Sequence, residues 1–178
     1  MNHPDHVALI AEGVRDAGRR WLELGAGEGL FTAALADVLG DGAEVVAVDR
    51  DRWALAELTA RIERDFPAAA VDAVFADFQD GLPAGPFDGV LAANSLHFAD
   101  PIEPVLAAIH EALAPGARLV IVEYDAMHGN PYVPHPISFA RWTALAPAAG
   151  FTAPRLLHRV PSRFLGSIYG AVVERAEA

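Results

Sequence analysis

Three glycines and two aspartates have the types and spacing of a ligand-binding edge. Gly25, Gly27 and Gly29 form a G-x-G-x-G turn between an apolar segment and a predicted helix, and Asp49 and Asp77 each end a further apolar segment. A carboxylate can accept hydrogen bonds from two vicinal hydroxyls at once. Asp49 lies 24 positions after Gly25, in the range where an acidic residue meets a nucleoside ribose. The first chemistry predicted is therefore the binding of a nucleoside-containing ligand.

Each feature taken alone also has a structural explanation, because glycine turns join strands to helices without ligands and aspartates often cap helices. Two aspartates on successive strands behind the turn favour a binding site. The dinucleotide fingerprint G-x-G-x-x-G would need glycine at position 30, which is leucine here. The chain also contains no lysine, so it has no Tyr-x-x-x-Lys pair. Both observations disfavour a nicotinamide-dependent oxidoreductase.

His97 is the candidate general base, because it follows the fourth predicted strand at the edge facing a substrate. The alternative is a histidine that serves only packing or the surface. Three more residues share this rim after the fifth predicted strand: Glu123, Tyr124 and His128. Together with Asp125, His128 and His135 match no strong metal-ligand spacing, so no metal site is predicted.

The hydrophobic pattern predicts strands that alternate with helices, as five βα units followed by a hairpin. Strands are expected at about 20–25, 44–49, 71–76, 87–93, 119–124, 156–160 and 164–174, and helices at about 5–18, 28–39, 51–65, 101–113 and 138–148. Asp5 is the expected first N-cap, and Trp53 and Trp142 are expected to pack within helices. The predicted fold is one α/β domain over 1–178, with a doubly wound, mainly parallel seven-stranded sheet of Rossmann-like type. Residues 1–19 would form a short N-terminal helical cap.

The composition limits the classes of function. The chain has 178 residues, no cysteine and a formal net charge of −11, and all 13 basic residues are scattered arginines. No basic face for nucleic acid is therefore predicted. No run approaches the roughly 18 apolar residues of a membrane span, and the first residues lack the pattern of a signal peptide. A cytoplasmic protein without a membrane partner is predicted.

Five segments, in their order along the chain, resemble the class I S-adenosylmethionine-dependent methyltransferases. They are Glu23–Gly29, Val46–Asp49, Ala76–Phe78, Phe87–His97 and Leu113–Leu119. The resemblance covers about residues 20–124, and the order of elements agrees to the end. Methyltransferases of adenine amino groups usually carry an Asp/Asn-Pro-Pro-Tyr/Phe motif after strand four, whereas this place reads Asn94-Ser95-Leu96-His97. The resemblance therefore does not extend to that subfamily.

The resemblance implies S-adenosylmethionine as the cofactor and assigns its contacts residue by residue. The methionine part would be held by Glu23 and by the backbone at Gly25, Ala26, Gly27 and Gly29. Asp49 would take the ribose hydroxyls, with Arg50 packing near the adenine. Asp77 and Phe78 would bind the adenine, and Asn94 would lie beside the methionine end, next to the substrate.

The resemblance also implies direct transfer of a methyl group from sulfur to a nucleophile. Holding the nucleophile, methyl group and sulfur in line would supply much of the rate increase. His97 is the candidate general base. The predicted function is methylation of a small-molecule acceptor. The alternative is a non-catalytic S-adenosylmethionine-binding partner or regulatory subunit, because the substrate-covering N-terminal segment is short. Loop 125–137 or a second subunit would close the pocket, so the sequence leaves open whether the chain forms a homo-oligomer.

Overall fold

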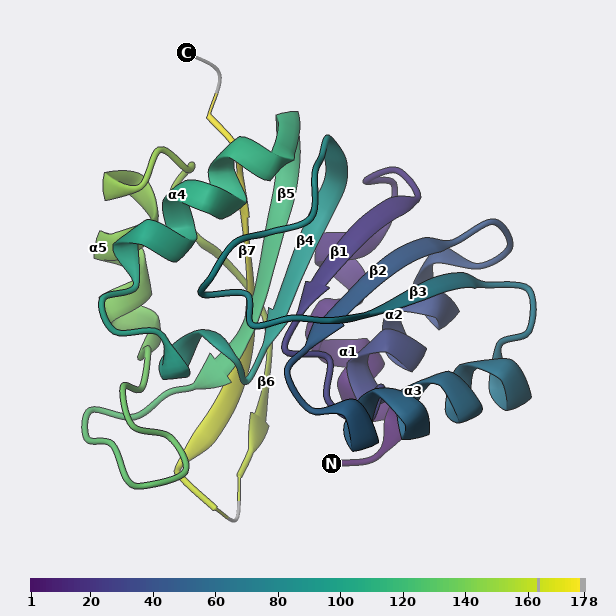
Figure 1. Cartoon of the computed structure of the whole chain (residues 1–178). Coiled ribbons are helices and arrows are strands. Elements are labelled where there is room, and N and C mark those ends of the chain that lie inside the picture. Colours follow the sequence, from purple (N-terminus) through teal and green to yellow (C-terminus); the bar gives the residue numbers. More distant parts are fainter. Residues whose placement is uncertain (163, 177–178) are drawn as a thin grey trace.

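In the described residues, 1–162 and 164–176, the computed structural model shows one seven-stranded sheet between two layers of helices (Figure 1). The strands are β1 (Arg20–Leu24), β2 (Glu44–Asp49), β3 (Ala70–Phe75), β4 (Phe87–Ala93), β5 (Leu113–Tyr124), β6 (Arg155–Pro161) and β7 (Ser167–Glu174). The helices are α1 (His3–Val14), α2 (Leu30–Leu39), α3 (Arg52–Asp65), α4 (Glu103–Ala112) and α5 (Phe139–Ala148), with a 3-10 turn η1 (Leu96–Phe98). The predicted doubly wound α/β fold is confirmed.

The sheet has the strand order β3-β2-β1-β4-β5-β7-β6. Its first five strands are parallel, while β7 is antiparallel to both β5 and β6, as the predicted hairpin requires. In the middle, Leu24 of β1 lies opposite Val48 of β2 and Ala92 of β4. From β1 the chain adds β2 and β3 on one side of the sheet and then β4 and β5 on the other side. Ligands of open α/β sheets bind at the carboxyl ends of the strands beside such a reversal in strand order.

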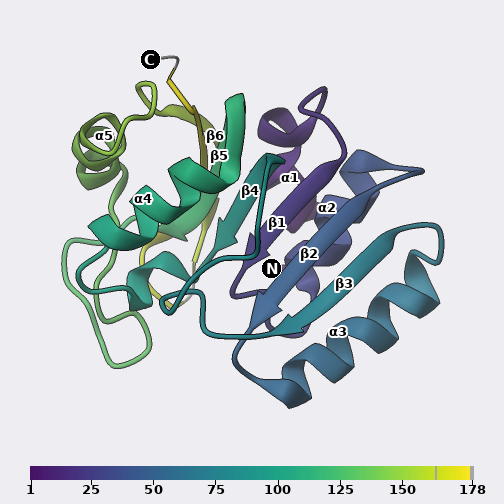
Figure 2. The same ribbon diagram turned by 45° about the horizontal axis from the view of Figure 1, so that its top comes forward.

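Helices cover both faces of the sheet, as Figures 1 and 2 show, and each face buries its own apolar layer. On one face α4 and α5 cover β4, β5 and β7, and Leu22 and Leu24 of β1 belong to this core. On the other face α1, α2 and α3 cover the sheet, and Trp21 of β1 belongs to that core. The alternation follows from the two-residue period of a strand. Because both faces are covered, the central strands are continuous apolar runs.

The N-terminal helix begins earlier than expected and has a different N-cap residue. Asn2, not Asp5, is the N-cap of α1: the Asn2 side chain accepts from the Asp5 amide at 2.9 Å and the Asp5 carboxylate accepts from the Asn2 amide at 3.0 Å. Leu9, Ile10 and Val14 are fully buried against the sheet. Residues 1–19 thus supply a core helix and, within the described residues, no part of the pocket described below.

The chain between β3 and β4 has no helix in residues 76–86, as the predicted element ranges expect, so there is one βα unit fewer than the five predicted. One strand boundary does depart from the prediction. The fifth strand begins earlier than expected, because Leu113 pairs with Phe87 before an irregularity shifts the register to Arg118 opposite Gly89. Turn residues in 114–117 therefore lie within a strand rather than before it.

The two helix tryptophans have opposite environments. Trp142 is fully buried, as expected, whereas Trp53 is 85% exposed. The buried positions of α3 are Leu55, Leu58 and Ile62, and Trp53 falls outside the stripe that they form. The expectation that Trp53 packs against the core is wrong. In the part of the chain that the structure describes, no helix has the length and apolar character needed to cross a membrane.

Candidate functional site

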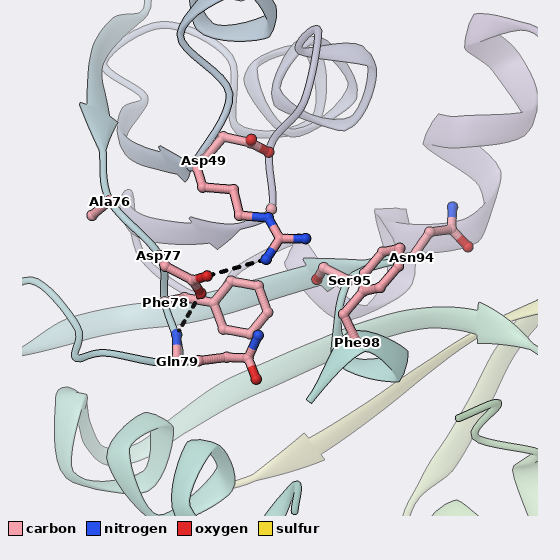
Figure 3. Close-up of a pocket in the computed structure, with 10 residues that line it drawn as sticks. Asp49, Ala76, Asp77, Phe78, Gln79, Asn94, Ser95 and Phe98 are labelled. Carbon is pink, nitrogen blue, oxygen red and sulfur yellow. Dashed lines mark hydrogen bonds and ion pairs between the residues drawn. The ribbon is translucent and has the colours of Figure 1, made fainter. Parts of the chain in front are cut away.

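A pocket of about 170 Å³ opens at the carboxyl edge of the sheet, beside the reversal in strand order (Figure 3). The residues that follow β1, β2, β3 and β4 form its walls. Its lining consists of Gly25, Asp49, Arg50, Ala76, Asp77, Phe78, Gln79, Asn94, Ser95 and Phe98. The structure thus brings together six of the residues to which the resemblance gives a cofactor role: Gly25, Asp49, Arg50, Asp77, Phe78 and Asn94.

The three glycines of the turn after β1 have different structural roles. All three have left-handed backbones, with φ of 71°, 53° and 80° at Gly25, Gly27 and Gly29. A Cβ at Gly25 would lie 2.5 Å from the Ser95 Cβ, and a Cβ at Gly29 would lie 2.8 Å from the Leu58 Cγ. A Cβ at Gly27 would meet no described atom within 4 Å. Gly25 and Gly29 therefore permit close packing, while Gly27 leaves open space.

Asp49 holds the glycine turn against the end of β2. Its Oδ2 accepts a hydrogen bond from the Gly27 amide at 2.8 Å, and its Oδ1 accepts one from the Asp51 amide at 2.8 Å. Each carboxylate oxygen has a second lone pair, so the group can still accept from ligand hydroxyls at the pocket. Ala26 does not line the pocket; it is buried, and its amide donates to the Val48 carbonyl at 3.0 Å.

Arg50 reaches across the pocket to Asp77. Its Nη1 lies 3.2 Å from the Asp77 Oδ2, a contact drawn as a dashed line in Figure 3. The other oxygen of Asp77 accepts from the Gln79 amide at 3.0 Å, which fixes the start of the loop after β3. Because the Arg50 side chain is exposed, the ion pair contributes only about 0–1 kcal/mol and can open readily for a ligand. The Phe78 side chain is buried in the hydrophobic core and so anchors this wall of the pocket.

Two buried polar atoms at the end of β4 have no partner among the described residues. They are the Oδ1 of Asn94 and the Oγ of Ser95, and both residues line the pocket. Asn94 also has a left-handed backbone, with φ of 53°, and its amide donates to the Val122 carbonyl at 2.7 Å. Buried polar groups are almost always hydrogen-bonded in proteins. These two atoms therefore suit a ligand with polar groups of its own.

Glu23 does not reach the pocket lining. It is buried beneath the first turn of α2, where the Thr32 hydroxyl donates to its Oε2 at 2.6 Å. Burial raises the pKa of the Glu23 carboxyl to about 8, the Asp49 charge adds to the rise, and the Thr32 hydrogen bond opposes it. The carboxyl is therefore mostly protonated at neutral pH, and its direct structural role is to join β1 to α2.

His97 is buried and paired with Glu123 at the end of β5. The Nδ1 of His97 lies 2.8 Å from the Glu123 Oε2, and the His97 amide donates to Oε1 at 3.2 Å. A carboxylate at Nδ1 fixes the tautomer in which Nε2 can accept a proton. His97 does not itself line the pocket, but its ring packs on that of Phe98, which does, with centroids 4.4 Å apart.

The sequence patterns assign no role to Ser95 and Gln79, although both adjoin predicted site residues in the chain. Glu123 is predicted only as a residue of the rim. Its pairing with His97 joins positions 26 apart on two different strands, and no spacing rule signals such a contact.

Among the described residues, the histidines of loop 125–137 share no interaction partner. The Nε2 of His135 lies 3.7 Å from the Asp100 Oδ2, while Asp125 pairs with Arg159 at 2.9 Å. His128 is exposed. In residues 1–162 and 164–176, no three His, Asp or Glu side chains are grouped as a metal site would require.

Comparisons with known proteins agree on the family. Residues 5–168 match the family described as a methyltransferase domain. The O-methyltransferase cnsE of Penicillium expansum is 36% identical over 120 residues, 66% of this chain and 42% of that protein. The ubiquinone biosynthesis O-methyltransferase of Azotobacter vinelandii is 32% identical over 135 residues, 72% of this chain and 53% of that protein. The chain thus spans about half the length of these two relatives.

The fold of a solved methyltransferase structure is also similar to the fold of this chain. The 1,6-didemethyltoxoflavin-N1-methyltransferase of Burkholderia thailandensis superposes with a TM-score of 0.74 at 25% identity. The superposition covers 98% of this chain and 77% of that one. The Burkholderia structure contains 1,6-didemethyltoxoflavin and S-adenosylhomocysteine.

Proposed function

Because the chain belongs to the family of methyltransferase domains, we propose that it uses S-adenosylmethionine to methylate a small-molecule acceptor. The observation that carries the proposal is the pocket at the strand-order reversal, where Asp49, Asp77 and Asn94 converge from three strand ends. Two relatives are named as O-methyltransferases, which supports a hydroxyl acceptor. The cytoplasmic location and the lack of nucleic-acid and membrane partners stay predictions from composition.

The chemistry of the lining fits the cofactor. Asp49 keeps free lone pairs for two ribose hydroxyls, and Asp77 can accept from an adenine amino group once Arg50 moves. The oxygens of Asn94 and Ser95 that have no partner among the described residues would give the methionine end polar neighbours. The backbone of the glycine turn, with open space at Gly27, would hold the amino-acid part, and Glu23 would act through that turn. When bound, S-adenosylmethionine supplies an electrophilic methyl group.

His97 is the proposed general base, and Glu123 is the residue that positions it. With Nδ1 directed at Glu123, Nε2 is left to take the proton of an acceptor hydroxyl. The buried carboxylate stabilises the positive charge that the imidazole then gains. The pair lies next to Phe98, so the base borders the pocket without being part of its lining.

The alternative function is binding without catalysis, as a partner or regulatory subunit. A protein that only binds the cofactor has no need of a buried histidine–carboxylate pair beside the pocket. The pair therefore favours an enzyme, although it also contributes packing.

Calorimetric titration with S-adenosylmethionine, S-adenosylhomocysteine and NAD tests the cofactor proposal. The first two should bind and NAD should not. A methyl-release assay over small hydroxyl and amine acceptors then tests the activity. Binding of NAD alone, or of none of the three, would contradict the proposal. Binding of S-adenosylhomocysteine without turnover of any acceptor would favour the non-catalytic alternative.

A further inference from the structure

Five rings form a continuous row that begins at the cofactor pocket. Phe98 packs on His97 with centroids 4.4 Å apart, and His97 lies 6.2 Å from Tyr124. Tyr124 lies 5.9 Å from Phe164, which lies 5.8 Å from Tyr132. The last three contacts are edge-to-face, with interplanar angles of 61° to 74°. We call these five residues the ring row.

The ring row is assembled from four separate segments at the carboxyl edge of the sheet. Phe98 and His97 follow β4, and Tyr124 ends β5. Phe164 lies in the connection between β6 and β7, and Tyr132 lies in loop 125–137. Since β7 is antiparallel to β5, the hairpin tip is brought to the same edge as the end of β5. The row therefore extends outward from the proposed reaction centre.

Much of the ring row is open to solvent. Phe98, Phe164 and Tyr132 are 42%, 50% and 72% exposed, whereas His97 is buried. Isolated exposed rings are common on protein surfaces, but three exposed rings from three segments that ring contacts join in one row are a concentrated apolar surface. Phe98 also lines the pocket, so one end of the ring row adjoins the proposed site.

The segment that carries Tyr132 is held in place. The Asn130 side chain accepts hydrogen bonds from the amides of Tyr132 and Val133, at 2.8 Å and 3.0 Å. Val133 and Ile137 are buried, and the Tyr169 hydroxyl donates to the Ile137 carbonyl at 2.8 Å. Loop 125–137 thus presents Tyr132 from an anchored backbone, which reduces the ordering that a bound ring would require.

We propose that the ring row binds the methyl acceptor and that this acceptor is a planar aromatic or heteroaromatic compound with a hydroxyl group. The inference rests on the proposed function and names the acceptor class for the same site. Aromatic rings favour edge-to-face or offset contacts at centroid separations of roughly 4.5–7 Å, and the last three contacts of the row, at 5.8–6.2 Å, fall in this range. A flat ring placed against Tyr124, Phe164 or Tyr132 makes such contacts, whereas a flexible chain or a strongly hydrated ion gains little there.

The position of His97 within the ring row sets the direction of the bound acceptor. A hydroxyl at the pocket end of the acceptor would face His97 and Phe98, with the rest of the ring system along Tyr124. In the reaction the acceptor oxygen forms a bond to the methyl carbon as the bond from that carbon to sulfur breaks. The electron pair of the broken bond remains on sulfur, and the hydroxyl proton passes to His97.

Binding to the protein saturated with S-adenosylhomocysteine tests this inference. The probes are a panel of one- to three-ring phenols and hydroxylated heteroaromatics, each matched with its saturated-ring alcohol. Saturation-transfer NMR and calorimetry should detect aromatic members and should find the saturated partners at least about fivefold weaker, in line with the energy of ring contacts. Phe164→Ala and Tyr132→Ala should weaken aromatic binding by a similar factor, and Tyr132→Phe should retain it.

Met127→Ala is the matched control, because Met127 is 79% exposed on the same loop but is no part of the ring row. All variants should bind S-adenosylhomocysteine as the wild type does, which separates this inference from the cofactor proposal. Equal binding of aromatic and saturated compounds, no binding of any aromatic member, or unchanged binding in Phe164→Ala and Tyr132→Ala would overturn it. So would a change of oligomeric state in those variants by sedimentation, because the rings would then be a contact between copies.

Discussion

Asp49 serves both the fold and the proposed ribose contact, so its replacement needs a careful control. Asp49→Ala should weaken S-adenosylhomocysteine binding by about 1.5–3 kcal/mol, the range for hydrogen bonds to a charged group. The variant also loses the carboxylate that accepts from the Gly27 and Asp51 amides. Asp51→Ala is the control, because it removes the N-cap of α3 without touching the pocket lining. Calorimetric affinity unchanged in a folded Asp49→Ala protein would refute the ribose assignment.

Glu23 predicts a specific dependence of stability on pH. Its pKa is raised from 4.5 to about 8 in the folded protein, so the native state keeps a proton that the unfolded chain releases. The free energy of unfolding should therefore fall as the pH rises from about 4.5 to about 8. Glu23→Gln should flatten this part of the curve, measured by urea unfolding at pH 5, 7 and 9. The exposed Glu63→Gln should leave it unchanged, and parallel curves for Glu23→Gln and wild type would contradict the argument.

His97 and Glu123 predict a separation of binding from turnover. His97→Ala should lower kcat for an identified acceptor by about 10²–10⁴, the usual contribution of a general base. Its affinity for S-adenosylhomocysteine should stay that of the wild type, because His97 does not line the cofactor pocket. His135→Ala is the control, a partly exposed histidine of the neighbouring loop. Unchanged turnover in His97→Ala would leave the pair as packing residues only.

At the scale of elements, the glycine turn after β1 allows a matched pair of variants. Gly27 and Gly40 both have a positive φ, of 53° and 68°, and a Cβ at either meets no described atom within 4 Å. Gly27→Val and Gly40→Val should therefore both be destabilised in urea unfolding, since a β-branched residue is strained at a positive φ. Only Gly27→Val should lose S-adenosylhomocysteine binding by calorimetry. Loss in both variants, or in neither, would make the turn purely structural.

The elements that the sequence predicts well are those with a strong local signal. Continuous apolar runs locate β1, β2 and β4, and the three turn glycines need the left-handed backbones that a strand-to-helix turn suggests. The early part of β5 was hidden because Pro115 and Gly116 resemble a break, while pairing with β4 continues the strand through them. Tertiary pairing decides such a segment, and local propensity cannot reveal it.

The same distinction explains the site. The residues at strand ends could be predicted to meet, because the carboxyl ends of parallel strands share one edge. The contact between His97 and Glu123, and the ring row from Phe98 to Tyr132, join segments far apart in the chain. Their existence depends on sheet order and on loop conformation. The sequence supplies the side chains but no signal of which pairs touch.

At the scale of the whole molecule, charge predicts which acceptors the chain avoids. The formal net charge is −11, and all positive side chains are arginines spread along the sequence. A protein without a basic face releases few counterions from a polyanion, so its retention on RNA or DNA should be weak. We expect no salt-sensitive retention on bulk RNA or DNA columns near pH 7. Elution that moves steadily with added salt would count against a purely small-molecule enzyme.

The left-handed backbone of Asn94 has a consequence for how this position tolerates change. A library of all substitutions at position 94, sorted first for abundance, should keep glycine and deplete valine and isoleucine, because few side chains accept a φ of 53°. Sorted again for cofactor retention, glycine should drop out, because it lacks the oxygen that is buried at the pocket without a partner among the described residues. The two rankings would diverge at this one codon, so folding and function can be read separately from the same library.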